Sequence, residues 1–554
     1  MEKLVKVQYR DKIIKEYPIE TTLLDIAQDF QHEYAYPILV AKVDNDIVEL
    51  SDKITKKCTI DFYDRSSAIG NSIYSRGVHF LMIVAIKKVL GDDTEVRIEH
   101  SIDKGVYCEI EDKEINEDIL KQVEKKMEEL SKADYNFVKL NVSRRDAIHF
   151  FQKRKQFDKV KVLKYISNTF VNLYRLDEYY DYFFSDMPYS TKVLDDFKLT
   201  YIKDNGFVLS YPSVDDPRST KNYKHHKKLF DAFLEYTEMG RTLNINTAAD
   251  LNEVITTGNY NYLIQLSEAR YNSQLSNVAE MIAKNKKIKV ILLAGPSSSG
   301  KTTTSKKLEI YLRAHGFITH SISTDDYFYS LKDTPKKENG DYDFESIRAV
   351  DTDLFNKQLL KLLNGEKVLL PEYNFIIGER EYKKKWLQLK ENDIIVIEGL
   401  HALNPELTLA IEDSNKFKIY ISPLTQLNID KHNRIHTSDT RRLRRIIRDN
   451  KYRGYNAAET LRNWHNIKEG EEEYVFPFQN DADIVINSAL IYELGVLKTY
   501  AEPLLFSVDE EDEVYPEAIR LINFLRNFLP IPSDDVPIDS VLREFIGGSC
   551  FHDK

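Results

Sequence analysis

Cysteine is scarce in this sequence, and several other signals are missing. The only cysteines are Cys58, Cys108 and Cys550, and no two of them form a CxxC pair. This spacing argues against a disulfide framework or a thiolate zinc site and favours ordinary reduced thiols. No apolar run approaches the ~20 residues that cross a bilayer, and the charged start MEKLVKVQYRDK lacks the apolar stretch of a signal peptide. We therefore expect a cytoplasmic protein without membrane contact.

The overall composition is that of a large globular protein. Hydrophobic residues make up 42% of the 554 residues and charged residues 30%. At roughly 100–200 residues per domain, this length predicts three or four domains. The formal net charge of −11 argues against attraction of the whole chain to nucleic acid or anionic membrane, although it permits local basic patches.

Changes in residue pattern divide the chain into five predicted parts. Residues 1–64 have the pattern of a small α/β module, with strands around one Thr-capped helix and a hairpin. Residues 65–240 form a second α/β region, with a buried helix at GVHFLMIVAIKKVLG, strands at FKLTYIK and GFVLSYP, and a polar loop at SVDDPRSTKNYKHHKK. Residues 241–287 form a helical connector. In residues 288–505, short apolar runs alternate with amphipathic segments, which is typical of strands buried on both faces of a parallel sheet. Residues 506–554 form a tail with two helices.

The sharpest motif is a glycine-rich loop between an apolar strand and a helix. The sequence GPSSSGKT fits GxxxxGK[ST], follows VILLA and precedes the helical pattern TTTSKKLEIYLRAHG. In this context backbone N–H groups hold phosphate oxygens, Lys301 reaches the β and γ phosphates, and Thr302 holds Mg²⁺. The predicted ATP-binding residues are Gly295, Ser297, Ser298, Ser299, Gly300, Lys301, Thr302 and Thr303.

Two acidic residues follow later strands. Asp325 lies at the end of the predicted strand SISTDDYFYS, where a carboxylate can accept the proton of an attacking hydroxyl. Taken alone, a helix cap or turn explains Asp325 and Asp326 equally well. Glu398 ends the strand DIIVIEG, where it can hold the Mg²⁺ shell, or simply end the strand.

Arginine is concentrated in the segment DTRRLRRIIRD, with five arginines within eight residues. At helical spacing Arg441, Arg444, Arg445 and Arg448 share one face. A run of this kind is usually a solvated basic helix. Beside a phosphate loop, however, guanidinium groups suit the charge of a transferring phosphoryl group, so we predict a mobile arginine lid over ATP.

Together these motifs resemble the uridine kinase and phosphoribulokinase family over residues 288–505. GPSSSGKTT, STDDYF, LPEYNF, IEGLHAL and DTRRLRRIIRD match its phosphate loop, acidic segment, nucleoside loop, acidic strand end and arginine lid. The resemblance implies a doubly wound parallel sheet that carries ATP·Mg²⁺. The implied catalytic residues are Lys301, Asp325, Arg441, Arg444 and Arg448; substrate binding falls to Asp325, Asp343, Tyr373, Arg380 and Arg441, and metal binding to Thr302 and Glu398.

The nucleoside loop departs from the family pattern at two positions. Pro371, Tyr373 and Phe375 match it, but Asn374 stands where uridine kinases commonly have Asp, and Gly378 where a His often contacts the base. These departures leave the nucleobase open. The phosphoryl chemistry is less affected.

The N-terminal half resembles a different family, the threonyl-tRNA synthetases. Residues 1–64 look like their TGS domain and residues 65–240 like their editing domain. The editing domain uses two His, a Cys and a further His, but the matching positions here are Arg76, Phe80, Phe183 and Met187. Since none of these side chains offers imidazole or thiolate, and His79 lies nearby alone, we infer a lost metal site.

The sequence therefore predicts an α/β protein: a P-loop kinase domain preceded by a β-grasp-like TGS domain and an α+β synthetase-editing-like domain. We expect an ATP-dependent nucleoside kinase, most readily for uridine or cytidine, that phosphorylates the 5′-hydroxyl. Two alternatives stay open: a kinase of another small alcohol such as a sugar phosphate, and a nucleotide-sensing RNA-binding regulator. We also expect a homo-oligomer and an RNA or nucleotide effector at the N-terminal domains.

Overall fold

The N-terminal segment folds into a mixed five-stranded sheet in the order β2-β1-β5-β3-β4, covered by one helix. The computed structural model describes residues 4–10, 13–203, 205–337, 340, 342–374, 377–383, 385–425 and 427–551. The elements of this first part are β1 (Leu4–Tyr9), β2 (Ile13–Pro18), α1 (Leu23–Phe30), β3 (Ile38–Val43), β4 (Asp46–Glu49) and β5 (Cys58–Asp64). Thr22 caps α1 by accepting the N–H of Asp25, and Ile26 and Phe30 pack onto the sheet. This is the predicted β-grasp-like domain.

The second part packs two antiparallel sheets around a long buried helix. Its elements are α2 (Ala68–Leu90), β6 (Val96–Ile102), β7 (Gly105–Ile110), α3 (Glu117–Lys132), β8 (Val138–Ser143), α4 (Arg144–Lys153), α5 (Phe157–Tyr165), β9 (Phe170–Leu176), β10 (Tyr179–Tyr182), β11 (Lys198–Lys203) and β12 (Gly206–Ser210). The strand orders are β11-β12-β7-β6 and β10-β9-β8. The apolar run predicted as a buried helix forms the C-terminal part of α2, and the strands predicted at FKLTYIK and GFVLSYP pair as β11 and β12.

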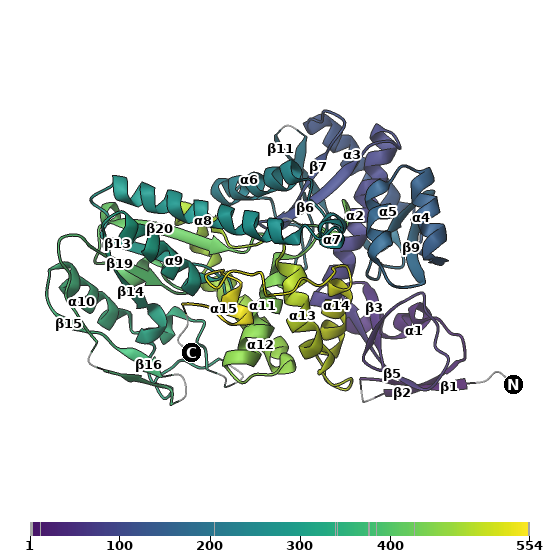
Figure 1. Cartoon of the computed structure of the whole chain (residues 1–554). Helices are drawn as coiled ribbons and strands as arrows, with labels where there is room; N and C mark the ends of the chain where they lie inside the picture. The colour runs from purple at the N-terminus through teal and green to yellow at the C-terminus, as the bar shows by residue number, and fades with distance from the viewer. Residues whose placement is uncertain are drawn as a thin grey trace.

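The C-terminal half is built on a parallel sheet in the order β14-β19-β13-β20-β21. Alternate residues of β13 enter different cores: Ile291 and Leu293 pack with α8 and α9 on one face, and Val290 and Leu292 with α10 on the other. Helices therefore cover both faces, as the unbroken apolar strand sequences predict. Figure 1 shows this sheet on the side of the molecule away from the N-terminal domain.

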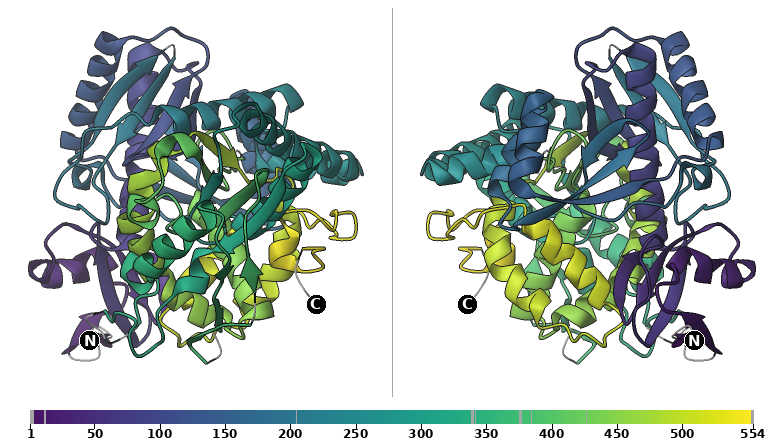
Figure 2. Two further views of the ribbon diagram at one scale, coloured as in Figure 1. Left: turned by 90° about the vertical axis from the view of Figure 1, so that its left-hand side faces the viewer. Right: turned by 90° about the vertical axis from the view of Figure 1, so that its right-hand side faces the viewer.

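The elements of this half are α6 (Lys227–Leu243), α7 (Ala248–Thr256), α8 (Tyr260–Lys284), β13 (Val290–Ala294), α9 (Lys301–Ala314), β14 (Ile318–Ser323), α10 (Thr352–Leu363), β15 (Val368–Leu369), β16 (Glu372–Asn374), β17 (Glu379–Glu381), β18 (Trp386–Leu387), β19 (Asp393–Glu398), β20 (Lys416–Ser422), α11 (Thr437–Tyr452), α12 (Ala457–Tyr474), β21 (Ile484–Asn487), α13 (Glu493–Phe506), α14 (Tyr515–Leu525) and α15 (Arg543–Ile546). Helices α13 and α14 lie between the parallel sheet and the N-terminal domain (Figure 1), and the right-hand view of Figure 2 shows these yellow helices beside the purple first domain. Asn45 of the first domain donates to the backbone oxygens of Glu510 and Asp512, each at 2.7 Å.

The predicted fold class is confirmed, with differences in detail. The helical segment starts with α6 at Lys227, inside the stretch predicted as a polar loop, because its apolar face packs onto the domain before it. The sheet β10-β9-β8 was not predicted. The second helix predicted in the tail is the single turn α15. No helix among the described residues is long and apolar enough to cross a membrane.

One hydrophobic cluster extends across both halves of the molecule. Phe151 and Leu163 of α4 and α5 belong to the same cluster as Leu275 of α8 and Ile419 of the parallel sheet. The loop between β20 and α11 enters the second domain, where the N–H of Ile98 donates to its backbone at 2.8 Å. The kinase-like half is therefore built onto the N-terminal domains and is not joined to them by a free linker.

Candidate functional site

Three neighbouring strands of the parallel sheet end at the candidate site. The glycine-rich loop follows β13, Asp325 follows β14 in a short 3-10 helix, and Glu398 is the last residue of β19. β19 lies between the other two, and Glu398 is in register with Ser323 and Leu293. Because the carboxyl ends of parallel strands share one edge, these residues meet where ligands bind in such sheets.

The glycine-rich loop has the backbone that its motif requires. Gly300 is the N-cap of α9 with a φ of 87°, in the left-handed region that favours glycine. A Cβ there would lie 2.3 Å from Cγ2 of Val541. Any other residue would therefore be strained and would collide with the C-terminal segment.

Lys301 lies at the centre of a group of charged side chains. Its ammonium donates to the backbone oxygens of Gly295 at 2.9 Å and Pro296 at 3.2 Å. Burial lowers the pKa of Lys301, and the carboxylates of Glu398 and Asp325 oppose this shift. Lys301 is nevertheless partly exposed, as expected for a group in a recess that a ligand can enter.

The two predicted carboxylates share this recess. Burial raises the pKa of Asp325, against the attraction of Lys301, Arg453 and Arg448. Burial and the neighbouring Asp325 raise the pKa of Glu398 to about 7. Perturbed carboxyl groups that face one lysine in a recess are typical of catalytic sites.

The donor set at this edge fits a magnesium ion. Thr302, in the first turn of α9, offers a partly exposed hydroxyl, and Glu398 and Asp325 offer carboxylate oxygens. Mg²⁺ prefers such hard oxygen ligands and keeps several of its waters, so few protein ligands are needed. Among the described residues no group of three His, Cys, Asp or Glu side chains could hold a metal.

The arginines of α11 contact the glycine-rich loop. Arg441 donates through Nε to the backbone oxygen of Ser297 at 2.9 Å and pairs with Glu471 of α12. Arg445 donates to the hydroxyl of Ser297 at 2.6 Å. The predicted helix is therefore present, and both of these arginines contact Ser297 of the loop directly.

Two further arginines of α11 have different surroundings. Arg444 is fully buried, donates to Glu493 at 2.8 Å, and reaches the backbone oxygen of Ser298 at 3.4 Å. Arg448 lies beside Asp449, and burial lowers its pKa to about 10. In this structure the arginines pair with carboxylates of the chain. Arg444 acts as a fixed support of the loop, and Arg448 is the arginine of α11 whose charge affects the pKa of both Lys301 and Asp325.

Two carboxylates of the chain accept backbone N–H groups of the phosphate loop. Glu471 accepts the N–H of Ser297 at 2.7 Å, and Glu544 of α15 accepts the N–H of Thr303 at 3.0 Å. Nearby, the Ser488 hydroxyl donates to the backbone oxygen of Ser299 at 2.6 Å. Both acids stand where the motif places phosphate oxygens. Neither was predicted, because they lie far along the chain from the loop.

The predicted acceptor residues Tyr373 and Arg380 lie opposite each other in the β16–β17 hairpin. Arg380 pairs with Asp351 at 2.9 Å, and the N–H of Tyr373 donates to Asp326 at 3.3 Å. Asp326 thus ties the hairpin to the segment that carries Asp325. Phe375 lies outside the described residues.

The structure explains why the nucleoside loop departs from the family pattern at Gly378. Gly378 has a φ of 69°, and a Cβ there would lie 2.2 Å from Leu331. With this backbone, a histidine at position 378 would be strained and would clash.

The segment GDYDFES contains Asp343, whose substrate-binding role stays a prediction, and a second acid, Glu345. The backbone N–H of Asp343 donates to the oxygen of Pro335 at 2.8 Å. Glu345 lies among Arg445, Glu471, Lys301 and Asp325, and burial raises its pKa to about 7. His401 of IEGLHAL is buried near Lys301. Both stand in motifs that the sequence singled out, so motif position alone could have suggested them.

The four positions matched to editing-domain ligands come together in the second domain. The rings of Phe80 and Phe183 lie 5.3 Å apart, and Met187 is buried in the same core. Arg76 donates to the backbone oxygen of Asp186 at 2.8 Å. Apolar packing fills the place where the resemblance would put a metal.

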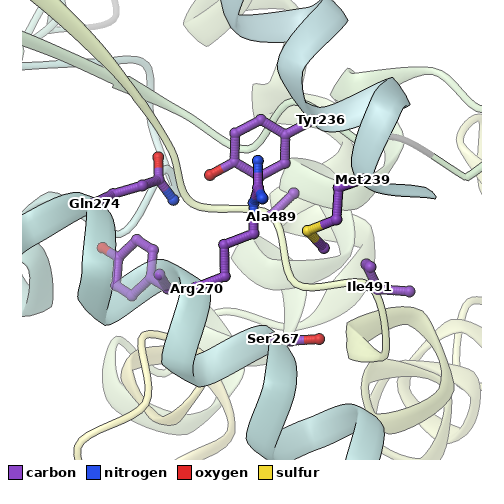
Figure 3. A pocket seen from close by; sticks show the side chains of 8 residues that line it. Tyr236, Met239, Ser267, Arg270, Gln274, Ala489 and Ile491 are labelled. Carbon is purple, nitrogen blue, oxygen red and sulfur yellow. The ribbon is translucent and has the colours of Figure 1, made fainter. Parts of the chain in front are cut away.

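A small cavity lies between α6, α8 and the segment that follows β21. Its volume is about 10 Å³, and its lining includes Tyr236, Ser267, Arg270 and Gln274 (Figure 3). Such a volume holds about one water molecule. The cavity therefore offers no room for a nucleotide.

Known proteins match the two halves separately. Residues 290–492 match the model of the Phosphoribulokinase / Uridine kinase family, whose members are phosphotransferases with alcohol acceptors. A uridine kinase of Schizosaccharomyces pombe is 28% identical over 244 residues, which are 42% of this chain and 49% of the relative. A uridine kinase of Limosilactobacillus reuteri is 29% identical over 206 residues, 37% of this chain and 85% of the relative.

The N-terminal half has a different relative. A threonine–tRNA ligase of Syntrophotalea carbinolica is 28% identical over 201 residues, 36% of this chain and 32% of the ligase. The chain thus spans about half of the yeast relative and a third of the ligase. Both parts of the predicted resemblance are confirmed.

Proposed function

Because residues 290–492 match the model of the phosphoribulokinase / uridine kinase family, we propose that the chain is an ATP-dependent nucleoside kinase. Uridine and cytidine are the first candidates for the acceptor. The observation that carries the proposal is the convergence of Lys301, Asp325, Glu398 and Arg448 in one recess at the end of three strands. In this proposal Lys301 binds phosphate, Asp325 acts as the base, Glu398 binds the metal ion, and Arg448 closes over the phosphates.

In the proposed reaction, Lys301 and the N–H groups of the loop hold the phosphates of ATP. Asp325 accepts the proton of the nucleoside 5′-hydroxyl, whose oxygen forms a bond to the γ phosphorus as the bond to ADP breaks. Products are ADP and a nucleoside 5′-monophosphate. Mg²⁺ held at Thr302 and Glu398 would neutralise phosphate charge. Arg448 would stabilise charge that spreads over the transferring group, and Arg441 and Arg444 position the loop.

A panel of acceptors tests the proposal. The purified protein is incubated with ATP, Mg²⁺ and, singly, uridine, cytidine, adenosine, guanosine, thymidine, ribulose 5-phosphate or pantothenate, and products are identified by mass spectrometry. We expect a monophosphate of uridine or cytidine that is absent with Lys301→Ala, since loss of a phosphate-loop cation lowers turnover by orders of magnitude.

The other outcomes separate the alternatives. Phosphorylation of ribulose 5-phosphate or pantothenate alone would replace the nucleoside with another small alcohol. Intact ATP with every acceptor, together with RNA that is retained on purification and released by salt, would favour the RNA-binding regulator. Assembly into a homo-oligomer stays a prediction.

The contact of Glu544 with the loop predicts a further effect. If the N–H of Thr303 binds phosphate, the Glu544 carboxylate must leave it when ATP enters. Glu544→Gln removes the negative charge and keeps the shape of the side chain, so we expect about 3- to 10-fold tighter binding of a non-hydrolysable ATP analogue, measured by calorimetry.

Glu511→Gln serves as the matched control, because Glu511 is an exposed acid in the same C-terminal segment. Its affinity for the analogue should equal that of the unaltered protein. Unchanged or weaker binding by Glu544→Gln would mean that Glu544 only caps α9 and does not compete with phosphate.

A further inference from the structure

Positive charge is concentrated on α4 and α5 of the second domain. Residues 144–164 contain eight Lys or Arg side chains and two Asp, although the whole chain has a formal net charge of −11. The two helices pack side by side at the outer side of this domain, away from the parallel sheet (Figure 1). At one end the N–H of Gln156 donates to the backbone oxygen of Phe151 at 3.0 Å. At the other end the Arg144 guanidinium donates to the backbone oxygen of Ile166, so the two helices form one continuous surface.

Five cations of this surface have no counterion. Arg145 and Lys153 lie on the solvent-facing side of α4, eight residues and about 12 Å apart. Arg154 and Lys155 follow in the turn to α5, and Lys164 lies on α5 itself. All five side chains are exposed, and none of them forms an ion pair with any residue that the structure describes. They therefore remain available to the phosphates of a polyanion.

Aromatic rings alternate with these cations. Phe157, which is 60% exposed, begins α5, and Phe170, which is 56% exposed, begins β9 beside the start of α4. The Arg154 guanidinium lies over two further rings, 4.4 Å from the centre of Phe150 and 5.3 Å from that of Tyr180. A single exposed ring is common on protein surfaces. Exposed rings among unpaired cations are the combination on which unpaired bases stack while the backbone follows the charge.

We define the α4–α5 surface by its exposed cations and rings: Arg145, Lys153, Arg154, Lys155, Lys164, Phe157 and Phe170. We propose that this surface binds single-stranded nucleic acid. The five cations bind its phosphates, and bases stack on Phe157 and Phe170. Rings of this kind can stack only on bases that are not already paired and stacked in a duplex. The proposal gives the expected RNA effector a defined surface.

The packing of α4 argues against an anionic membrane as the partner. A helix that lies on a bilayer inserts an apolar face between the lipids. The apolar residues Ala147 and Phe151 of α4 are instead buried in the core of the protein. The exposed side therefore offers charge and separate rings without an apolar face.

The opposite side of α5 faces the kinase-like half. There Lys159 pairs with Asp430 at 2.8 Å, in the loop before α11. Arg441 and Arg445 of α11 contact Ser297 of the phosphate loop. A strand bound to the exposed side of α5 is therefore in position to change nucleotide affinity, and a bound nucleotide to change the affinity for the strand. This consequence rests on the proposed nucleotide site, whereas the binding of nucleic acid does not.

Fluorescence anisotropy with the full-length protein, without ATP, tests the proposal. The probe is a labelled single-stranded RNA of about twelve nucleotides, compared with single-stranded DNA of the same sequence and with an RNA duplex. Vesicles of phosphatidylserine and phosphatidylcholine test the membrane by co-sedimentation. The variants are Arg145→Gln/Lys153→Gln, Phe157→Ser/Phe170→Ser, Lys301→Ala and, as matched control, Lys286→Gln/Lys287→Gln, which removes two exposed cations after α8.

We expect the two surface variants to fail in different ways. Loss of two cations should weaken RNA binding at least about tenfold and reduce the slope of log Kd against log salt by about 1.4. Loss of the two rings should weaken binding at least about tenfold with the slope unchanged, because stacking releases no counterions. The lysine control and Lys301→Ala should bind RNA as the unaltered chain does, and all melting temperatures should agree.

The remaining comparisons identify the ligand. Equal affinity for RNA and DNA would show binding through backbone and bases alone, and tighter binding of RNA a contact to the 2′-hydroxyl. Four results would overturn the proposal: tighter binding of the duplex, binding to vesicles but not to oligonucleotides, affinity unchanged in both surface variants, or no binding at all. Binding lost only in Lys301→Ala would place the RNA at the phosphate loop and equally contradict it. Because the assay contains no ATP, its failure leaves the proposed kinase reaction untouched.

Discussion

Asp325→Asn is expected to lower kcat about a thousandfold, because an amide cannot accept the proton of the attacking hydroxyl. The structure places this carboxyl at the end of β14, beside Lys301 and Glu398. Burial raises its pKa, which makes the carboxylate a stronger base than an exposed aspartate. Asparagine has nearly the same shape, so the loop and its contacts should persist.

Two measurements distinguish a role of Asp325 as the general base from a purely structural role. The dissociation constant of a non-hydrolysable ATP analogue should change less than about threefold, since Asp325 acts on the acceptor and not on the loop. Asp333→Asn, an exposed acid in the next turn of the chain, should leave kcat unchanged. If Asp325→Asn kept most of its turnover, the base would have to be another group of the recess, and Glu345 would be the next to test.

The pH dependence of the unaltered enzyme provides a check on the same site. Asp325 must be deprotonated to accept a proton, and its raised pKa places this step above the ordinary range of aspartate. We therefore expect kcat/KM to rise with pH through the mildly acidic region, and Asp325→Asn to abolish that limb.

The sequence predicted those features that depend on local pattern. The strand–loop–helix context of Lys301, the strand ends at Asp325 and Glu398, and the common face of the α11 arginines all follow from neighbouring residues. Unbroken apolar strands also predicted a sheet covered on both faces. These signals are short-range, so one sequence suffices to read them.

Partners that are distant along the chain could not be predicted. Glu471 and Glu544 accept N–H groups of the phosphate loop from 174 and 241 residues away. The sequence shows them as ordinary acids in amphipathic helices. The sheet β10-β9-β8 was missed because VKLNVS and FVNLYRL mix polar and apolar residues without a clean alternation. Glu345 was not predicted, because Arg445, Glu471 and Lys301, whose charges act on it in the folded chain, also lie far from it in the sequence.

The most consequential residue that sequence reasoning missed is Lys159 of α5. Its side chain is fully buried, and its ammonium lies 2.8 Å from both Asp181 and Asp430. Burial alone would lower the pKa of Lys159, but the two carboxylates raise it above its ordinary value. Asp181 also pairs with His432. This cluster joins the second domain to the loop that leads into α11.

Lys159→Met is expected to destabilise the protein by about 3–5 kcal/mol, because it leaves two carboxylates buried together without their cation. In a thermal melt we expect a loss of roughly 5–10 °C for a chain of this size. Lys161→Met is the matched control: Lys161 lies two residues along the same helix, about half exposed, with an ion pair to Asp250. Exposed pairs contribute roughly 0–1 kcal/mol, so its melting temperature should change little.

The position of this cluster also predicts which other parts of the molecule Lys159→Met affects. The Asp430 side chain accepts the N–H groups of His432 and Asn433, and Asn433 donates to the backbone oxygen of Tyr182 at 2.9 Å. Losing Lys159 should therefore free the start of α11 and weaken nucleotide binding, even below the melting temperature. If Lys159→Met melted like the control and bound the ATP analogue normally, the cluster would not couple the two halves, and the N-terminal domains could not act on the phosphate loop by this route.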